Sequence, residues 1–434
     1  MVNTNDLANA TKIISNKIGI LSHISKLPLL NTDPKLVGYG IWPADTLQLG
    51  AGKYGGRSSG TGYVWQDGLI STIGETVERY CPAFYKKEDN MLSSYQNLGK
   101  PAIHPNEYAL YHEKQYEIFK KNKISIVPFQ EDTEIYWTEC IDLTQNGAES
   151  WVPSICVYMP WDLDPHHIIL NTSTGLAAHT DIHKAILAAL FEIIERDTFV
   201  TTWAHKLPMK KIVINNEIRD FLKQSFPDHY EFHFVDITHD LGVPTVFGIC
   251  FAEAEFGKFV AVGASTRSTM GEALQKTILE IGQGVSYQRH TLGEHKNWEP
   301  DDNFNKLRNF ELHSIFYSKR HDLWHAFDPW RNAEPVREID LFEKDDRSDD
   351  EKIKDILTSF KEKSISVLFK DLTTVDVQQA GFYAIKVYAP QLIQMAGGFP
   401  FYFLGGRRLY ENPTHFGYPK KDYAELNKFP HPFP

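Results

Sequence analysis

The sequence predicts a mixed protein of the α/β or α+β class. Short apolar runs typical of strands alternate with longer amphipathic runs typical of helices along most of the chain. The 434 residues are 42% hydrophobic and 23% charged, which is ordinary for a folded protein and argues against long disorder. We therefore expect mixed sheets flanked by helices around a large core.

Helices and a glycine-rich segment are expected in the N-terminal part of the chain. Helix 5–25 is predicted from apolar residues at helical spacing, namely Leu7, Ile13, Ile14 and Ile18. Residues 37–70, rich in Gly and Ser, are either a cluster of surface turns or a nest of backbone amides for phosphate. They lack the Gly-Lys-Ser/Thr ending of a Walker loop. Helix 68–84 follows from the apolar stripe Ile70, Ile73 and Val77.

The middle of the chain is expected to alternate strands with helices. Tyrosines and other apolar residues predict a helix over 104–127, and Asp181 is the expected cap of helix 181–200. Further helices are expected over 216–224 and 270–290. Strands are expected over 124–127, 135–137, 152–158, 211–214, 232–237, 243–251 and 258–262, the last two as a pair.

Residues 291–350 differ in composition, because they are polar, charged and dotted with Trp. We expect an insertion or lid there, ending in an exposed linker at 343–351. A helix over 351–362 and strands over 364–368 and 382–387 follow. We divide the chain into an N-terminal helix and extended segment, 1–50, and a main catalytic domain, 51–434.

Charge and cysteine content exclude several function classes. The net charge of −11 argues against general affinity for nucleic acid or anionic membranes, which attract basic surfaces. The four cysteines form no CxxC pair, so neither a disulfide framework nor a structural zinc site is expected. The N-terminus lacks a signal pattern, and no apolar run is long enough to span a membrane. A cytoplasmic protein is expected.

Three helices carry a repeated acidic pattern. Their spacing predicts that the polar residues of each helix share one face. These residues are Glu75, Glu78 and Arg79 in the first helix, Glu192, Glu195 and Arg196 in the second, and Glu280 and Gln283 in the third. Exposed helical salt bridges are one interpretation. The apolar neighbours of these carboxylates favour another, in which the helices are buried and face one site. Such oxygen ligands suit Mg²⁺, with the arginines facing phosphate oxygens.

The C-terminal sequence Pro430-His-Pro-Phe-Pro434 has the pattern PxPxP. Three interpretations stay open: a frayed terminus, a ligand for an SH3-type domain, or a stiff tail that enters the protein's own site. Arg407 and Arg408, just before it, are expected either to contact an anionic ligand or to be structural.

Together these motifs resemble the YcaO family, and specifically the azoline-forming cyclodehydratases (D proteins) of thiazole/oxazole-modified peptide biosynthesis. The resemblance spans roughly residues 50–434. It rests on Ser71-xxx-Glu75-xx-Glu78-Arg79, on Ser173–Ala178 followed by Glu192–Asp197, on Ala273–Leu274 with Glu280-xx-Gln283, and on the terminal PxPxP. Three positions depart from the family pattern: Thr61 stands where a Lys is usual, Thr174 replaces an Asn, and His179 replaces a Gly.

The resemblance implies a YcaO-type fold with an ATP site between acidic helices. It implies that Mg²⁺ is held by Glu75, Glu78, Glu192, Glu195 and Glu280. The implied ATP contacts are Ser71, Glu75, Arg79, Arg196, Gln283, Lys184 and Arg57, the last of which, or Lys53, would replace the missing Lys. The implied catalytic tail comprises Pro430, Pro432 and Pro434, with the carboxylate of Pro434 as a base.

The implied reaction is ATP-dependent cyclodehydration of a ribosomal precursor peptide, as in bacteriocin maturation. A Cys, Ser or Thr side chain attacks the preceding amide, the amide oxygen is phosphorylated, and loss of phosphate leaves a thiazoline or (methyl)oxazoline. Alternatives are a thioamide- or amidine-forming YcaO enzyme, and a non-catalytic ATP-binding scaffold.

The resemblance also implies partners. The chain is shorter than the fused form of these enzymes, so a separate C protein or E1-like leader-binding protein is expected to deliver the peptide. An FMN-dependent azoline dehydrogenase is a further expected partner. A homodimer is expected from the prevalence of twofold symmetry.

Overall fold

The computed structural model describes residues 4–17, 19–54 and 56–434, in which the strands form three sheets. The three-stranded sheet comprises β1 (Leu21–Lys26), β2 (Val37–Pro43) and β3 (Ser58–Gly62). The five-stranded sheet has the order β11 (Gly257–Thr266), β10 (Thr245–Ala254), β9 (Glu231–Asp236), β8 (Lys210–Ile212) and β12 (Pro335–Arg337). The six-stranded sheet has the order β4 (Met91–Ser93), β5 (Ile135–Asp142), β13 (Leu368–Asp371), β14 (Tyr383–Tyr388) and β7 (Leu176–His179), with β6 (Ala148–Pro153) also on β5. Neighbouring strands are antiparallel except β8 and β12.

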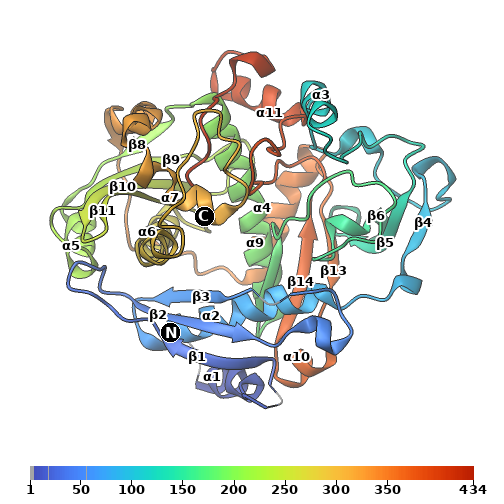
Figure 1. The fold of residues 1–434 in the computed structure, drawn as a ribbon, viewed down its shortest axis with the longest axis horizontal. Helices are drawn as coiled ribbons and strands as arrows, with labels where there is room; N and C mark the ends of the chain where they lie inside the picture. The colour runs from blue at the N-terminus through green and yellow to red at the C-terminus, as the bar shows by residue number, and fades with distance from the viewer. Residues whose placement is uncertain (1–3, 18, 55) are drawn as a thin grey trace.

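Three long helices lie between these sheets. They are α2 (Trp65–Tyr80), α4 (Ile182–His205) and α6 (Met270–Glu294). Figure 1 shows α4 in the middle of the molecule, with the β8–β11 sheet on one side and β13 and β14 on the other. The remaining α-helices are α1 (Thr4–Ala10), α3 (Glu113–Lys121), α5 (Asn216–Ser225), α7 (Phe310–Lys319), α8 (Asp328–Arg331), α9 (Asp349–Glu362), α10 (Val375–Gln379) and α11 (Arg407–Glu411). The structure thus confirms the mixed α/β class.

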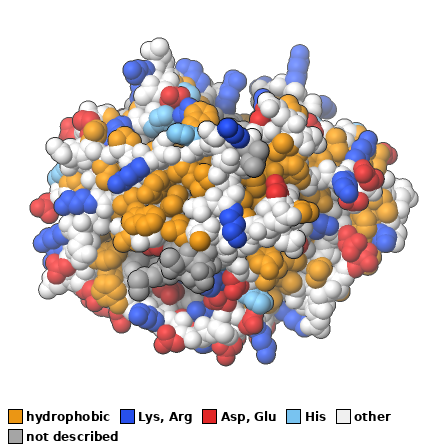
Figure 2. Space-filling model, turned by 90° about the horizontal axis from the view of Figure 1, so that it is seen from below, with side chains coloured by type: hydrophobic (Ala, Val, Ile, Leu, Met, Phe, Trp, Pro, Cys, Tyr) orange, Lys and Arg blue, Asp and Glu red, His pale blue; other side chains and the backbone are white. Residues whose placement is uncertain are grey.

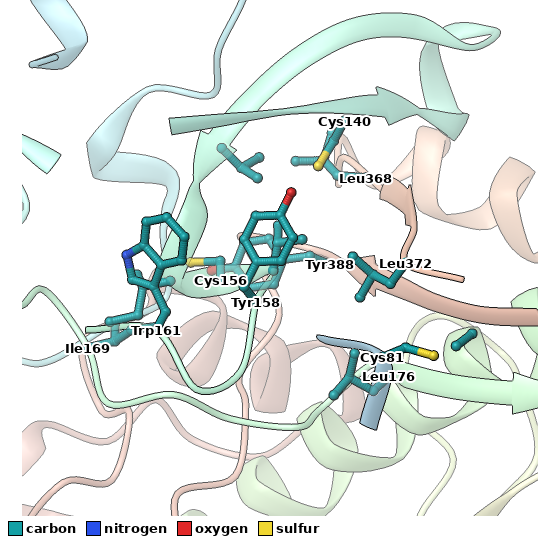
Figure 3. Packing of buried hydrophobic residues seen from close by; sticks show 14 of the residues in the cluster. Cys81, Cys140, Cys156, Tyr158, Trp161, Ile169, Leu176, Leu368, Leu372 and Tyr388 are labelled. Carbon is teal, nitrogen blue, oxygen red and sulfur yellow. The ribbon is translucent and has the colours of Figure 1, made fainter. Parts of the chain in front are cut away.

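Apolar burial connects the helices to the sheets. One core cluster packs around the six-stranded sheet and includes the fully buried Trp137 and Phe119. Figure 3 shows part of this cluster, where Cys81, Cys140 and Cys156 lie apart from one another among aromatic and aliphatic side chains. All four cysteines are buried, and none is paired in a disulfide.

Helix caps explain where two of the long helices begin. The Asp181 carboxylate accepts hydrogen bonds from the backbone amides of His183 and Lys184, which confirms its predicted capping role in α4. Thr269 caps α6 by accepting a hydrogen bond from the amide of Glu272. Side-chain caps therefore define where both helices start.

Six predicted elements are wrong. The strand over 152–158 ends at Pro153, where a 3-10 helix (Ser154–Cys156) begins, and the strand over 364–368 begins only at Leu368. The helix over 5–25 ends at Ala10, and residues 21–26 form β1 instead, while Ile18 lies outside the described residues. The glycine-rich segment contains strands β2 and β3 rather than only turns. The helix over 104–127 is reduced to α3, because Tyr108 and Tyr111 are buried in the core outside it. Residues 124–127 form no strand, only an isolated bridge from Ile126 to His167.

Residues 291–350, predicted as an insertion or lid, contain α7, α8 and β12. Their apolar side chains join a second core cluster, in which Ile315, Phe316 and Trp330 are fully buried. The segment therefore packs against the five-stranded sheet and the end of the chain.

Apolar side chains are also exposed, and many belong to the N-terminal part of the chain. These are Leu29, Leu30, Trp42, Leu47, Leu49, Val64 and Trp65, each between 45% and 57% exposed. Figure 2, seen from below, shows apolar side chains across the middle of that face and charged ones around its rim. Such surfaces are typical of contacts with other macromolecules. Within the described residues, no helix has the length and apolar character that crossing a bilayer requires.

Candidate functional site

One face of each long helix lines a single cavity of about 1110 Å³. The lining residues of α2 are Asp67, Ile70, Ser71, Gly74, Glu75, Glu78 and Arg79. Those of α4 are Lys184, Leu187, Ala188, Phe191, Glu192, Glu195 and Arg196. Those of α6 are Lys276, Glu280, Gln283, Gly284 and Tyr287. The spacing of three and four residues within each set places its members on one helical face. The structure therefore brings together the three acidic patterns that the sequence predicts to form one site.

Two glycines permit the helices to approach the strands that fix them. A Cβ atom on Gly60 of β3 would lie 2.4 Å from the backbone nitrogen of Thr72 in α2. A Cβ atom on Gly263 of β11 would lie 2.6 Å from the carbonyl oxygen of Thr277 in α6. Since real Cβ atoms do not approach so closely, only glycine lets these helices lie this near their sheets. The glycine-rich segment thus positions α2.

The first group of charges joins α2 to α4. Arg79 lies 3.7 Å from the Glu78 carboxylate, and both side chains are mostly shielded. Burial raises the pKa of Glu78 to about 8, against the lowering effect of Arg79, and the carboxylates of Glu192 and Glu75 raise it further. Burial also raises the pKa of Glu75. These carboxylates are thus held together at a cost that a bound cation would relieve.

The second group joins α4 to α6 and β11. Burial and the Glu280 carboxylate raise the pKa of Glu195 to about 8, while Arg196 and Arg267 oppose this. The backbone amide of Thr266 donates to Glu195 Oε2 at 3.2 Å. Arg196 Nε is buried, and no hydrogen-bond acceptor is assigned to it among the described residues. It lies 3.9 Å from Glu195 Oε1, so the guanidinium is ion-paired with that carboxylate.

The donor set fits a nucleotide with Mg²⁺ better than a metal held by protein alone. Within residues 4–17, 19–54 and 56–434, no three His, Cys, Asp or Glu side chains form a ready metal cluster. The carboxylates instead lie beside cations, with Glu192 3.7 Å from Arg196 and Glu280 3.6 Å from Lys276. Mg²⁺ is usually held by one or two carboxylates together with substrate phosphates. The five predicted glutamates, Asp67 and several basic side chains around one cavity match that requirement.

The end of the chain enters the same cavity. Phe433 and Pro434 are part of its wall, whereas Pro430 and Pro432, which the structure also describes, are not. The Phe433 ring packs 4.4 Å from that of Phe199 in α4. Of the three interpretations of PxPxP, the structure agrees with a tail tucked into the protein itself.

The positions that depart from the family pattern occupy different environments. Thr61 is buried in β3. Neither Thr61 nor Lys53, both of which the structure describes, lines the cavity. Arg57 does line it, and its guanidinium lies 4.1 Å from the centre of the Trp42 ring. The carbonyl of Thr174 accepts a hydrogen bond from the buried Lys386 at 2.7 Å. His179 lines the cavity.

Several lining residues were missed by the sequence reasoning, including Asp67, Lys276, Tyr287 and Arg267. Lys276 is four residues before Glu280 and Tyr287 is four after Gln283, so extending the predicted helical face would have found both. Arg267 follows β11 and has no such pattern.

Arg408 has a structural role rather than a ligand contact. Its guanidinium donates to Asp197 at 2.8 Å and to Asp240 at 3.0 Å, and all three side chains are largely buried. The neighbouring Arg407 is 82% exposed. The buried ion cluster attaches α11 to α4, directly after Arg196.

Comparisons with known proteins were consistent with this geometry. Residues 59–393 match the profile of a family described as YcaO cyclodehydratase, ATP- and Mg²⁺-binding. No curated protein matches the sequence.

Solved structures resemble the fold. A heterocyclase in complex with substrate and cofactor superposes with a TM-score of 0.75 at 21% identity, over 99% of this chain and 57% of that one. A YcaO protein from Methanopyrus kandleri bound with AMPPCP and Mg²⁺ gives 0.59 at 16% identity, over 86% of both chains. The E. coli microcin synthetase McbBCD complex gives 0.54 at 15% identity, over 85% of this chain and 88% of that one. The present chain thus spans little more than half the length of the heterocyclase.

Proposed function

The chain belongs to the YcaO cyclodehydratase family, and we propose that it forms azolines in a ribosomal precursor peptide at the expense of ATP. The observation that carries the proposal is the convergence of three acidic helix faces and the C-terminal tail on one cavity. A nucleotide site alone would need only the helices. The tail places a further group where a second substrate, the peptide, would meet the nucleotide.

The roles of the cavity residues follow from their chemistry. Glu75, Glu78, Glu192, Glu195 and Glu280 would hold Mg²⁺, and Arg79 and Arg196 would face phosphate oxygens. Ser71, Gln283, Arg57 and Lys184 line the same cavity and would complete the nucleotide contacts. Bound ATP with Mg²⁺ supplies the phosphoryl group that turns an amide oxygen into a good leaving group. The fixed guanidinium groups stabilise the negative charge that develops during that transfer.

The tail would contribute a base. Azoline formation requires the attacking side chain and the amide nitrogen to lose protons, and a carboxylate near the peptide can accept one. Pro434, the last residue of this sequence, lines the cavity and is exposed to it. Removing residues 430–434 is therefore expected to abolish ring formation and leave nucleotide affinity within about twofold, since the deletion removes none of the carboxylates and arginines of the acidic helices. Unchanged ring formation would refute the role of the tail.

A separate leader-binding protein, a C protein or an E1-like protein, would present the peptide. The microcin synthetase that this fold resembles is a complex of several proteins, and its structure has also been determined with pro-MccB17 bound. The exposed apolar side chains between Leu29 and Trp65 offer a surface for such a partner. An FMN-dependent dehydrogenase acting on the product, a homodimer and a cytoplasmic location belong to the same proposal.

The test is a reconstituted reaction with ATP, Mg²⁺, precursor peptide and partner. Mass spectrometry of the peptide should show the loss of one water for each ring formed, with phosphate released in step. A sulfur-for-oxygen mass change would instead identify a thioamide-forming enzyme. Nucleotide binding without any peptide change would identify a scaffold.

Two variants test the acidic site independently of the peptide. Glu75→Ala and Glu195→Ala each remove a carboxylate from a different group of charges, so each is expected to eliminate measurable binding of Mg²⁺ with a non-hydrolysable ATP analogue. Isothermal titration calorimetry measures this, with the exposed Glu117→Ala as the control. Wild-type affinity in both cavity variants would refute the site.

A further inference from the structure

We propose that His313 and Tyr317 of α7 are positioning residues that hold the C-terminal tail against the cavity. This gives a role to the segment predicted as an insertion or lid, because α7 lies within it. Only the effect of the docked tail on ring formation rests on the proposed function; the docking itself is tested separately.

His313 contacts the tail through both its ring and its nitrogen. Its Nδ1 lies 2.7 Å from the carbonyl oxygen of His431, to which it donates as the Nδ1–H tautomer. The two imidazole rings stack with centroids 4.1 Å apart and planes 12° apart. His313 Nε2 is left to accept from the Tyr402 hydroxyl at 3.3 Å. Both ring nitrogens of this fully buried side chain therefore have a partner. The Nδ1–H tautomer satisfies both, and its Nδ1–H group donates to the tail.

Tyr317 binds the tail one residue earlier. Its hydroxyl donates to the carbonyl oxygen of Pro430 at 2.8 Å, and its side chain is 1% exposed. Since proline has no amide hydrogen, the carbonyl is the only backbone hydrogen-bonding group that Pro430 offers. His313 and Tyr317 are four residues apart, so they lie on one face of α7 and bind consecutive carbonyls.

The opposite side of the tail is also held. His431 Nε2 donates to the carbonyl oxygen of Ala396 at 2.8 Å. Upstream, Trp203 Nε1 of α4 donates to the carbonyl oxygen of Phe429 at 3.0 Å. The tail is thus clamped between α7 and the segment that follows β14, while Phe433 and Pro434 continue to the cavity wall. Proline stiffness transmits this anchoring to the terminal residue, because few backbone rotations remain between Pro430 and Pro434.

The docking of the tail can be measured at His431, which is 5% exposed. Diethyl pyrocarbonate modifies accessible imidazoles, and peptide mapping reports the rate at each one. The exposed His183 in the same sample is the reference. Tyr317→Phe removes one oxygen and should raise the labelling rate of His431 about two- to tenfold, as expected for the loss of one buried hydrogen bond. His313→Leu should raise it further, because stacking is also lost.

Two variants separate positioning from general damage to the fold. His313→Asn retains a donor in place of Nδ1 and should label more slowly at His431 than His313→Leu. His321→Leu removes another ring from the same segment, one whose Nε2 lies 3.1 Å from the Lys258 carbonyl and not from the tail. It should leave His431 labelling unchanged. Unchanged labelling in both His313→Leu and Tyr317→Phe would overturn the proposal.

The catalytic meaning is tested on the same proteins. If the tail acts in ring formation, His313→Leu should lower kcat for ring formation at least severalfold, while nucleotide affinity stays within about twofold. The variant His313→Asn should retain part of the rate that His313→Leu loses. Raised His431 labelling with full ring formation would leave the docking contacts established and refute the role proposed for the tail. A parallel loss of nucleotide affinity would overturn the positioning role, because it would show a change spread through the site.

Discussion

The affinity of the cavity for Mg²⁺ with nucleotide should depend on pH in a direction set by Glu78 and Glu195. Both carboxyl groups have a pKa of about 8 in the unliganded protein, against an ordinary value of 4.5, chiefly because they are buried. A carboxylate must be ionised to bind Mg²⁺. Binding should therefore release protons and strengthen as the pH rises through 8.

The expected magnitude follows from the two pKa values. At pH 7 roughly one in ten of each group is ionised, which weakens metal binding by on the order of 1 kcal/mol per group. Between pH 7 and pH 9 the affinity should therefore rise by at least about tenfold. The unliganded fold should change in the opposite sense. Because protonation is favoured in the folded state, its stability should fall as the pH rises from 4.5 towards 8.

Titration calorimetry with a non-hydrolysable ATP analogue in buffers of different ionisation enthalpy measures both the affinity and the protons released. Glu78→Gln should bind more weakly at every pH and release about half as many protons. The exposed Glu117→Gln should behave as wild type. An affinity independent of pH, with no proton release, would refute the assignment of these carboxylates to metal binding.

Two predictions concern the buried contacts that support the site, namely the ion cluster of Arg408 and the pair His313 and His431. Arg408→Met should lower the free energy of unfolding by about 3–5 kcal/mol, because it leaves two buried carboxylates unpaired. Arg407→Met should change it by almost nothing, because that side chain is exposed. Chemical denaturation measures both variants, and equal losses would contradict the structural role of Arg408. Burial lowers the pKa of His313 to about 4 and that of His431 well below 6.5, with Arg196 also disfavouring a charge on His431. Neutral imidazoles thus favour the folded state, and this stability should be complete above pH 6.5 and be lost as the pH falls towards 4. His431 labelling after a brief exposure to pH 5 should therefore exceed that at pH 7 once corrected to the His183 reference, and equal corrected rates would contradict the coupling.

Helical periodicity made much of the site predictable. Glu75 and Glu78, and likewise Glu192 and Glu195, are spaced so that any helix places each pair on one face, and their apolar neighbours predict burial. The sequence could also indicate Asp181 as a cap, since capping depends on local geometry. These inferences needed no knowledge of distant contacts.

The errors arose where tertiary contacts override local pattern. The helical spacing of apolar residues between Leu7 and Ile18 predicts a helix that continues to residue 25, but residues 21–26 pair with β2, which satisfies their backbone in a sheet. Gly60 suggested a turn, although its missing side chain serves close packing of β3 on α2. Tyr108 and Tyr111 suggested a helix because their spacing is helical, although both rings fill the core from irregular backbone.

Other features depend on which distant segments meet. Arg267 joins the cavity only because β11 ends beside α4 and α6, and nothing near it in sequence indicates this. The choice between a ligand and a structural role for Arg408 required the positions of Asp197 and Asp240. The partners of the tail, His313 and Tyr317, lie more than a hundred residues before it.

The most direct test of the central claim follows the oxygen of the peptide. A precursor peptide labelled with ¹⁸O at the amide carbonyl that precedes the cyclised residue is converted with ATP, Mg²⁺ and the partner protein. Phosphorylation of that oxygen forms a bond to phosphorus before the bond to carbon breaks, so the released phosphate should carry the label. Rings formed with the label in water and unlabelled phosphate would contradict the account.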